Sequence, residues 1–118
     1  MKKCEVVKES RDFDKIIHTG KFVKNNELVI YYQFNNSDAN HFGISVGKKI
    51  GNAVTRNYYK RIIRNICDMN KNLYSKGKDY IIIVRKGCTI LDFNDINKSF
   101  VYLVKKIKEK EKQNEKTN

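Results

Sequence analysis

Residues 41–84 constrain the fold more strongly than any other part of the chain, because they read as strand, helix, strand. Large apolar and small side chains alternate along His41–Gly47, which is typical of a strand. A helix is predicted from about Asn52, a good N-cap, to about Asn72. The continuous apolar run Tyr80–Val84 predicts a buried strand. A helix between two strands favours a crossover, so we expect the two strands to lie parallel in one sheet.

Other elements flank this unit. Apolar side chains at helical spacing predict a helix at Ser10–Thr19. A strand is predicted at Glu27–Phe34, with its even-numbered side chains, Leu28 to Phe34, in the core. A last helix begins near Asp92 and carries an apolar side made of Phe93, Ile96, Phe100, Leu103, Val104 and Ile107. Beyond it, residues 109–118 are charged and polar, which predicts a disordered tail.

The odd-numbered side chains of Glu27–Phe34 form a second, mixed face. If this strand pairs with His41–Gly47 as a hairpin, Val29 and Tyr31 lie beside the small residues Gly43 and Ser45. The sequence then predicts a shallow trough on that face.

Composition limits the partners that such a protein can bind. The 118 residues suit one domain, and 25 Lys and Arg against 13 Asp and Glu give a formal net charge of +12. This surplus favours a polyanionic partner, nucleic acid before anionic membrane. The chain has no run of 18 apolar residues and no apolar signal segment near Met1. We therefore expect a cytoplasmic protein.

The Cys, His and acidic residues do not indicate metal, disulfide or hydrolytic chemistry. Cys4, Cys67 and Cys88 are odd in number and lack C-x-x-C spacing, which favours free thiols in a reducing compartment. His18 and His41 are far apart and have no cluster of further ligands. The acidic residues are dispersed, whereas a metal nuclease needs clustered carboxylates or histidines. We therefore expect no metal site and no catalytic residue in the polypeptide.

Segment 47–65 carries the strongest functional signal in the sequence. It contains no acidic residue and six basic ones: Lys48, Lys49, Arg56, Lys60, Arg61 and Arg64. On a helix, Arg56, Lys60 and Arg64 follow one another at four-residue spacing, and Asn57 and Arg61 lie beside them. The opposite face is apolar and can pack on the sheet through Tyr59, Ile62, Ile63 and Ile66.

This placement of charge opposes helix stability. Like charges at i, i+4 cost roughly a few tenths of a kcal/mol per pair, and Arg56 lies near the positive end of the helix dipole. We therefore interpret the first turn, with Arg56, Lys48 and Lys49, as an anion site suited to phosphate. A nucleotide-binding phosphate loop is excluded, because only three residues separate Gly47 from Gly51 and no Lys follows Gly51.

These residues resemble the signature of a known family, the protein subunit of bacterial ribonuclease P. The family signature has an Arg-Asn-Arg core, then Lys-Arg and a further Arg, where a strand leads into a helix. Here it reads GNAVTRNYYKRIIR at residues 51–64, after GISVGKK at residues 43–49. The early Arg11-Asp12-Phe13, the apolar strand near residue 81 and the overall length also fit. Tyr58 stands in the place of the second Arg of the core, which removes one expected cationic contact.

The resemblance implies an α+β fold. The expected architecture is a two-layer α/β sandwich whose central four-stranded mixed sheet is accompanied by three helices, with a left-handed βαβ crossover around the basic helix. The general rule predicts the opposite hand, because about 98% of crossovers are right-handed. The expected organisation is a single RNA-binding domain at residues 1–108, followed by the tail at residues 109–118.

The resemblance also implies a function. The protein would be the accessory subunit of an endoribonuclease whose RNA subunit hydrolyses precursor tRNA with magnesium, and the protein itself would bind no cofactor. Its partners would be the catalytic RNA and the 5′ leader of precursor tRNA. The expected RNA-binding residues are Lys48, Lys49, Arg56, Asn57, Lys60, Arg61 and Arg64. The leader would lie in a cleft between the first helix and the sheet, bordered by Phe13, Ile17, Val29, Tyr31 and Lys60.

Three alternatives remain open. A ribosomal or translation-factor-like RNA-binding domain without a nuclease role could carry a similar basic helix. A DNA-binding protein would present base-reading side chains on a recognition helix, often in a two-fold symmetric dimer. A membrane-surface protein would need an amphipathic helix with a strong apolar face, but the apolar residues of the last helix are better used in the core. We therefore expect neither DNA nor a membrane as partner.

Overall fold

The computed structural model describes residues 10–19, 21–35, 38–74 and 76–116, and its strands form a four-stranded mixed sheet. The order across the sheet is β1 (Lys21–Lys24), β2 (Leu28–Phe34), β4 (Lys78–Val84) and β3 (His41–Val46). β2 pairs antiparallel with both β1 and β4, whereas β3 and β4 are parallel. The predicted parallel crossover unit is therefore confirmed.

The condition on which the trough depended, a hairpin between β2 and β3, is not met, because β4 lies between these two strands. The side chains of Ile81 and Ile82 point to opposite faces of the sheet and are both fully buried. A strand that is apolar on both faces gains most from a central position, where it has a neighbour on each side. β1 was not predicted from the residues, because four residues with one buried side chain, Val23, carry little periodicity.

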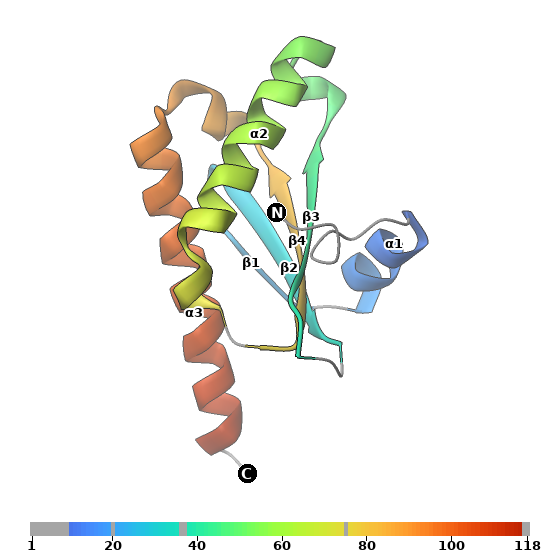
Figure 1. Cartoon of the computed structure of the whole chain (residues 1–118), viewed down its shortest axis with the longest axis vertical. Coiled ribbons are helices and arrows are strands. Elements are labelled where there is room, and N and C mark those ends of the chain that lie inside the picture. Colours follow the sequence, from blue (N-terminus) through green and yellow to red (C-terminus); the bar gives the residue numbers. More distant parts are fainter. Residues whose placement is uncertain (1–9, 20, 36–37, 75, 117–118) are drawn as a thin grey trace.

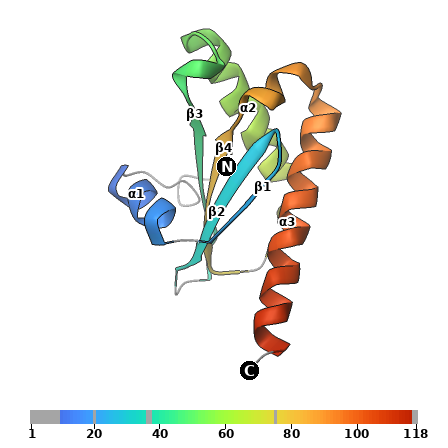
Figure 2. The same ribbon diagram turned by 180° about the vertical axis from the view of Figure 1, so that it is seen from behind.

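Helices cover the two faces of the sheet unequally. α2 (Ala53–Met69) and α3 (Phe93–Lys116) lie on one face, and α1 (Ser10–Thr19) lies on the other, near β2, β4 and β3 (Figures 1 and 2). Within the described residues, three short 3-10 helices lie in the connections: η2 (Lys48–Ile50), η3 (Lys71–Leu73) and η4 (Lys86–Ile90). No helix in the described ranges has the length and apolar character needed to cross a membrane.

The crossover from β3 through α2 to β4 is left-handed. In Figure 1 both strands run upward, α2 lies in front of the sheet, and β4 stands to the left of β3. A right-handed crossover would place β4 to the right. The structure thus has the hand that the family resemblance implied, against the general rule.

The main core fills the space between the sheet and the two helices α2 and α3. It contains the predicted inner faces of β2 and β3 and the apolar side of α3, all buried except Ile44, Phe34 and Phe93. Ile44 and Phe93 are partly buried against the core. Phe34 is a correction, because it is 74% exposed. As the last residue of β2, it lies at the end of the strand.

The predicted tail also needs correction. We expected disorder from residue 109, but α3 continues to Lys116. Residues 109–116 consist of Lys, Glu, Gln and Asn, and the first three favour helix, so they can extend an existing helix without apolar contacts. Residues 117–118 lie outside the described ranges.

Candidate nucleic-acid interface

The start of α2 is built by an N-cap. Asn52 has an extended backbone, and its side-chain oxygen accepts a hydrogen bond from the backbone N–H of Thr55 at 2.9 Å. The predicted cap is therefore confirmed. The cap occupies one N–H of the first turn, so the anion site predicted there has one donor fewer. η2 precedes the cap and presents Lys48 and Lys49, both exposed, on the same end of the molecule.

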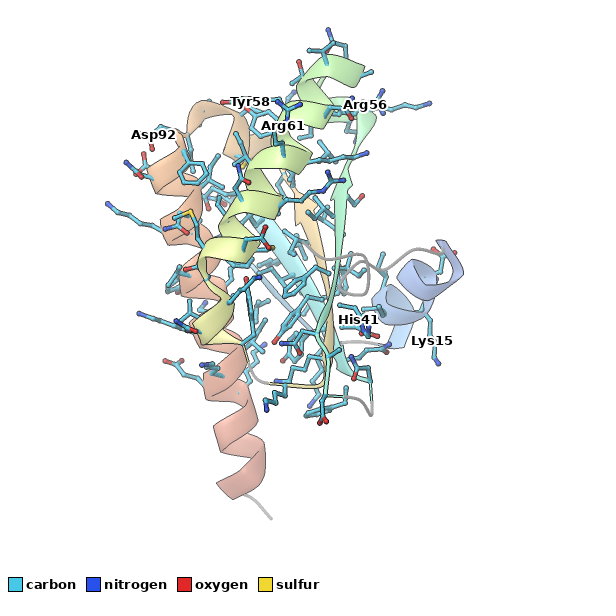
Figure 3. All side chains as sticks on the ribbon, in the orientation of Figure 1. Lys15, His41, Arg56, Tyr58, Arg61 and Asp92 are labelled. Atoms are coloured by element: carbon cyan, nitrogen blue, oxygen red, sulfur yellow. The ribbon has the colours of Figure 1, made fainter. Side chains whose placement is uncertain are left out.

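α2 has the two faces that its sequence predicts. Its apolar face is buried through Tyr59, Ile62, Ile63 and Ile66. Asn57, Arg61 and Arg64 are exposed, and Arg56 and Lys60 are half-buried. Figure 3 places Arg56 beside the end of β3 and Arg61 on the outer surface of α2. Because Lys60 and Arg64 follow Arg56 at one-turn intervals, the helix turns this basic flank toward β3.

These cations lack acidic neighbours in the described part of the chain. The six basic side chains form none of the ion pairs recorded there, and the first turn of α2 has no acidic residue. Asp68, the one acidic residue of α2, comes a full turn after Arg64. The buried Nε of Arg56 makes no hydrogen bond to another described residue. The basic flank therefore keeps its hydrogen-bond donors and its charge for an external anion.

The residues predicted to border the leader lie on the other face of the sheet, where α1 packs, apart from Lys60 of α2. Ile16 of α1 and Ile81 of β4 are fully buried, so α1 is fixed to the centre of the sheet. Ile17, Val29 and Tyr31 are half-buried, which leaves part of each side chain accessible. The side chain of Phe13, the fifth predicted cleft residue, lies outside the described ranges.

Strand register arranges this face in rows that run from one edge of the sheet to the other. One row contains Phe22, Tyr31, Ile81 and Gly43, and the next contains Lys24, Val29, Ile83 and Ser45. Side-chain size therefore falls from the β1 edge to the β3 edge. The insertion of β4 fills the middle of the predicted trough, but the β3 side keeps its small residues.

Phe22 is a member of this face that sequence reasoning missed. Its ring is 45% exposed and lies 5.5 Å from the ring of Tyr31, centroid to centroid, at an interplanar angle of 40°. Together the rings form a partly exposed aromatic platform. The apolar pair Phe22-Val23 between two lysines does not alternate, and four residues are too few to identify a strand and its faces.

Tyr58, the departure from the family signature, lies apart from the basic flank. It is 56% exposed and contacts the ring of Tyr59 edge-on at 5.3 Å. Figure 3 shows it on the α3 side of α2, whereas Arg56 is on the β3 side. The substitution therefore leaves the row of Arg56, Lys60 and Arg64 intact.

The described histidines and cysteines do not form a catalytic or metal-binding group. His41 Nδ1 lies 2.8 Å from Asp79 Oδ1, which connects the starts of β3 and β4, and His18 is exposed. Cys67 and Cys88 are buried free thiols, and burial raises the pKa of Cys67 to about 12 and that of Cys88 to about 11. Among the described residues, no three His, Cys, Asp or Glu side chains gather as metal ligands would.

Comparison with known proteins decides the family. The family model described as Ribonuclease P matches residues 1–108. The chain belongs to the ribonuclease P protein family. It is 45% identical over 109 residues to the ribonuclease P protein component of Mycoplasma mycoides subsp. mycoides, covering 92% of this chain and 100% of that protein. The identity to the ribonuclease P protein component of Streptococcus pyogenes serotype M5 is 41% over 105 residues, covering 89% and 87%.

Solved ribonuclease P proteins have the same fold. The protein from Thermotoga maritima superimposes with a TM-score of 0.80 at 33% identity, covering 86% of this chain and 96% of that one. The Staphylococcus aureus protein gives a TM-score of 0.80 at 36% identity, covering 88% and 95%. The chain is thus the protein subunit of a ribonuclease P with an RNA subunit as its partner, and a ribosomal or translation-factor-like role is not favoured.

Proposed function

We propose that the protein holds the 5′ leader of precursor tRNA between α1 and the sheet and binds RNA phosphates along α2, while the RNA subunit performs the hydrolysis. One observation carries this proposal: the small-residue side of the α1 face ends at the edge strand β3, and α2, the helix with the basic flank, lies beside β3 on the other face of the sheet (Figure 1). A single RNA strand that crosses the β3 edge would meet the α1 face first and the cations of α2 next.

The shape of the α1 face suits single-stranded RNA. At the β3 edge Ser45 is small and only half-buried, beside the buried Gly43, whereas Tyr31 and Phe22 offer ring faces on which bases can stack. Stacking of this kind demands no sequence, which agrees with a leader that differs from one precursor to another. Ile17 and Val29 would serve both in packing and as walls of the cleft.

The α2 cations would act on the backbone of RNA. Arg61, Arg64 and Asn57 are exposed and can reach phosphates of the RNA subunit, together with Lys48 and Lys49 of η2. The half-buried Arg56 and Lys60 would border the leader cleft. Positive charge placed between two polyanions reduces their repulsion, so the protein would lower the magnesium concentration at which the RNA subunit holds its substrate.

The assignment of hydrolysis to the RNA subunit is supported by the arrangement of carboxylates. Two-metal hydrolysis needs ligands that converge on ions about 4 Å apart. Asp79, the described carboxylate at the end of the cleft, is engaged by His41 and Asn35. The protein would therefore need no cofactor of its own, and the magnesium would belong to the RNA.

Tyr31→Ala tests the leader cleft. We expect the affinity for precursor tRNA, measured with the reconstituted holoenzyme, to fall about 5- to 150-fold, because stacking on an aromatic ring contributes roughly 1–3 kcal/mol per base. The affinity for mature tRNA, which lacks the leader, should not change. Phe34→Ala is the matched control, since Phe34 is an exposed aromatic residue of the same strand on the opposite face. Equal losses for precursor and mature tRNA would refute the leader assignment.

A further inference from the structure

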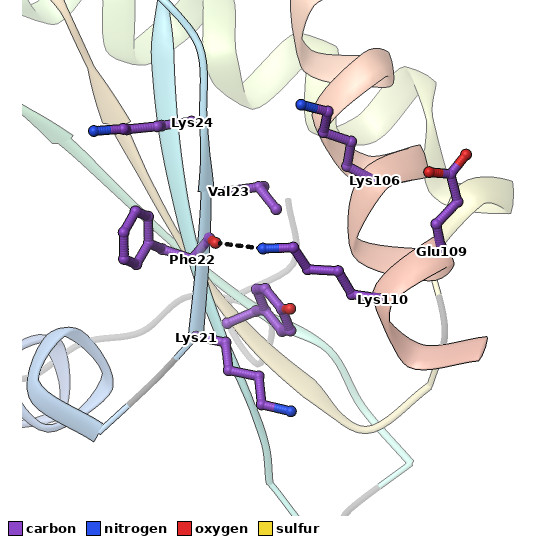
Figure 4. Close-up of a pocket in the computed structure, with 8 residues that line it drawn as sticks. Lys21, Phe22, Val23, Lys24, Lys106, Glu109 and Lys110 are labelled. Atoms are coloured by element: carbon purple, nitrogen blue, oxygen red, sulfur yellow. Dashed lines mark hydrogen bonds between the residues drawn. The ribbon is translucent and has the colours of Figure 1, made fainter. Parts of the chain in front are cut away.

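A second basic surface lies at the sheet edge opposite β3. Between β1 and the later turns of α3 runs an open groove of about 640 Å³. Figure 4 shows its two walls: Lys21 and Val23 extend from β1, and Lys106 and Lys110 extend from α3. The ring of Tyr32 also lines the groove. Phe22 and Lys24, which alternate with them along β1 and belong to the rows of the α1 face, also border the groove, and none of its lining residues belongs to α2.

The charge of this groove is almost entirely positive. Lys21, Lys106 and Lys110 point into it, and Glu109, the acidic residue at its rim, points away from β1 (Figure 4). Lys110 Nζ donates to the backbone oxygen of Phe22 at 3.3 Å, so its ammonium is held at the groove wall. Two walls that carry cations toward each other without a carboxylate between them repel each other.

A buried cation strengthens the same field from beneath. Lys78 of β4 is 1% exposed, and its Nζ lies 5.8 Å from the centroid of the Tyr32 ring. Burial, together with the charges of Lys108 and Lys21, lowers the pKa of Lys78 to about 8. A groove lysine is therefore close enough to Lys78 to disfavour its charge. An anion in the groove would relieve this repulsion.

We propose that the groove between β1 and α3 binds the sugar–phosphate backbone of an RNA segment, separately from the α2 surface. This proposal rests on the proposed function, which supplies RNA as the partner. An elongated polyanion fits an open groove with cations on both walls, and the apolar Val23 and the Tyr32 ring suit ribose or base edges better than they suit a second charged chain. Because β1 and β3 are the two edges of the sheet, the protein would hold two RNA segments apart by the width of the sheet.

The double variant Lys106→Gln/Lys110→Gln tests the groove. The matched control is Lys98→Gln/Lys105→Gln, which removes the same charge from exposed positions of α3 outside the groove. We expect the groove variant to bind a bacterial ribonuclease P RNA about tenfold more weakly at 150 mM salt. Its log–log salt slope should be smaller by about 1.4 to 1.8, since each lost phosphate contact removes roughly 0.7–0.9. The control should retain the affinity and slope of the unaltered protein.

Lysine acetylation followed by mass spectrometry shows which lysines contact RNA and whether that RNA is the RNA subunit or precursor tRNA. In the holoenzyme, Lys21, Lys106 and Lys110 should be protected, and Lys98 and Lys105 should react as in the free protein. Protection with the RNA subunit alone assigns the groove to that RNA, and protection only after precursor tRNA is added assigns it to the substrate.

Three outcomes would overturn the proposal. They are unchanged reactivity of the groove lysines, equal losses in the two double variants, and displacement of the RNA from the groove by an oligoglutamate peptide of equal charge, which would indicate a protein partner. Arg61→Glu separates the two proposals. If it weakens RNA binding while the groove variant does not, the groove proposal fails and the proposed function stands. If neither variant weakens binding, both proposals fail.

Discussion

Lys78 is the residue whose environment departs furthest from what its sequence predicts. A lysine at the start of a strand is normally solvated, yet this one is 1% exposed and its Nζ lies 5.2 Å from the ring centroid of Phe34. Burial makes the ammonium form less favourable, and Lys108 and Lys21 add repulsion, so the pKa is lowered to about 8. The buried lysine therefore links folding to pH.

The sign of this link is a testable prediction. In the unfolded chain Lys78 has a pKa near 10.5, so between about pH 8 and pH 10.5 the unfolded state binds more protons than the folded state. The contribution of Lys78 to the free energy of unfolding therefore increases as pH rises through this window. Lys78→Met should remove that contribution. Urea unfolding at pH 7.5, 8.5 and 9.5 measures it, and an identical pH dependence of the two proteins would contradict the prediction.

At the scale of elements, α2 combines a stabilising cap and apolar face with a destabilising row of charges. The cap at Asn52 and the burial of Ile63 and Ile66 hold the helix in place. The repulsion among Arg56, Lys60 and Arg64 works against it by roughly a few tenths of a kcal/mol per pair. A helix that keeps such a row is better explained by a polyanionic partner than by its own stability.

Charge reversal on α2 distinguishes a row of cations that binds RNA from a row that is only a solvated surface. Arg61→Glu and Arg64→Glu should each weaken binding to the RNA subunit and leave the melting temperature within a few degrees of the unaltered value, because both side chains are exposed. Lys98→Glu, an equal change of charge on α3, is the control. Filter binding at moderate salt and thermal melts provide the two readouts. Unchanged affinity in both α2 variants would mean that the row is only a solvated surface.

At the scale of the whole molecule, the chain has a formal net charge of +12, and two groups of its cations lie near opposite edges of one sheet. α2, which carries the basic flank, lies beside the edge strand β3, with Arg56 near the end of that strand, and the lysine groove lies at the β1 edge. A small protein with cations on both sides can reduce repulsion between RNA segments that approach it from different directions. Magnesium ions serve the same purpose less specifically.

Reconstitution of the protein with the RNA subunit tests whether the protein reduces repulsion between RNA segments. Adding the protein to a bacterial ribonuclease P RNA at low magnesium should restore removal of the 5′ leader, and the gain should shrink as magnesium or salt is raised. The RNA alone at high magnesium and the protein alone are the controls. Cleavage of precursor tRNA by the protein after the RNA has been destroyed would move the hydrolytic site to the polypeptide and refute its assignment to the RNA.

The positions and faces of most elements were accessible from the residues. The bounds of α1, the cap of α2 and the apolar sides of α2 and α3 depend on interactions within a few residues, which leave a periodic pattern in the chain. The acid-free row on α2 was visible for the same reason. The predictions failed at β1, which is too short to show a period, and at the tail, where Lys, Glu and Gln favour continuation of the helix.

Sequence by itself determined which side chains face inward and where the cations of α2 stand, because helix and strand geometry converts spacing directly into faces. Tertiary structure alone decided the place of β4 between β2 and β3 and the meeting of β1 with α3 in a lysine groove. It also explains Gly87, where a Cβ would collide with the backbone oxygen of Asn26. These features depend on contacts between residues far apart in the chain, and no local pattern records which distant partners will meet.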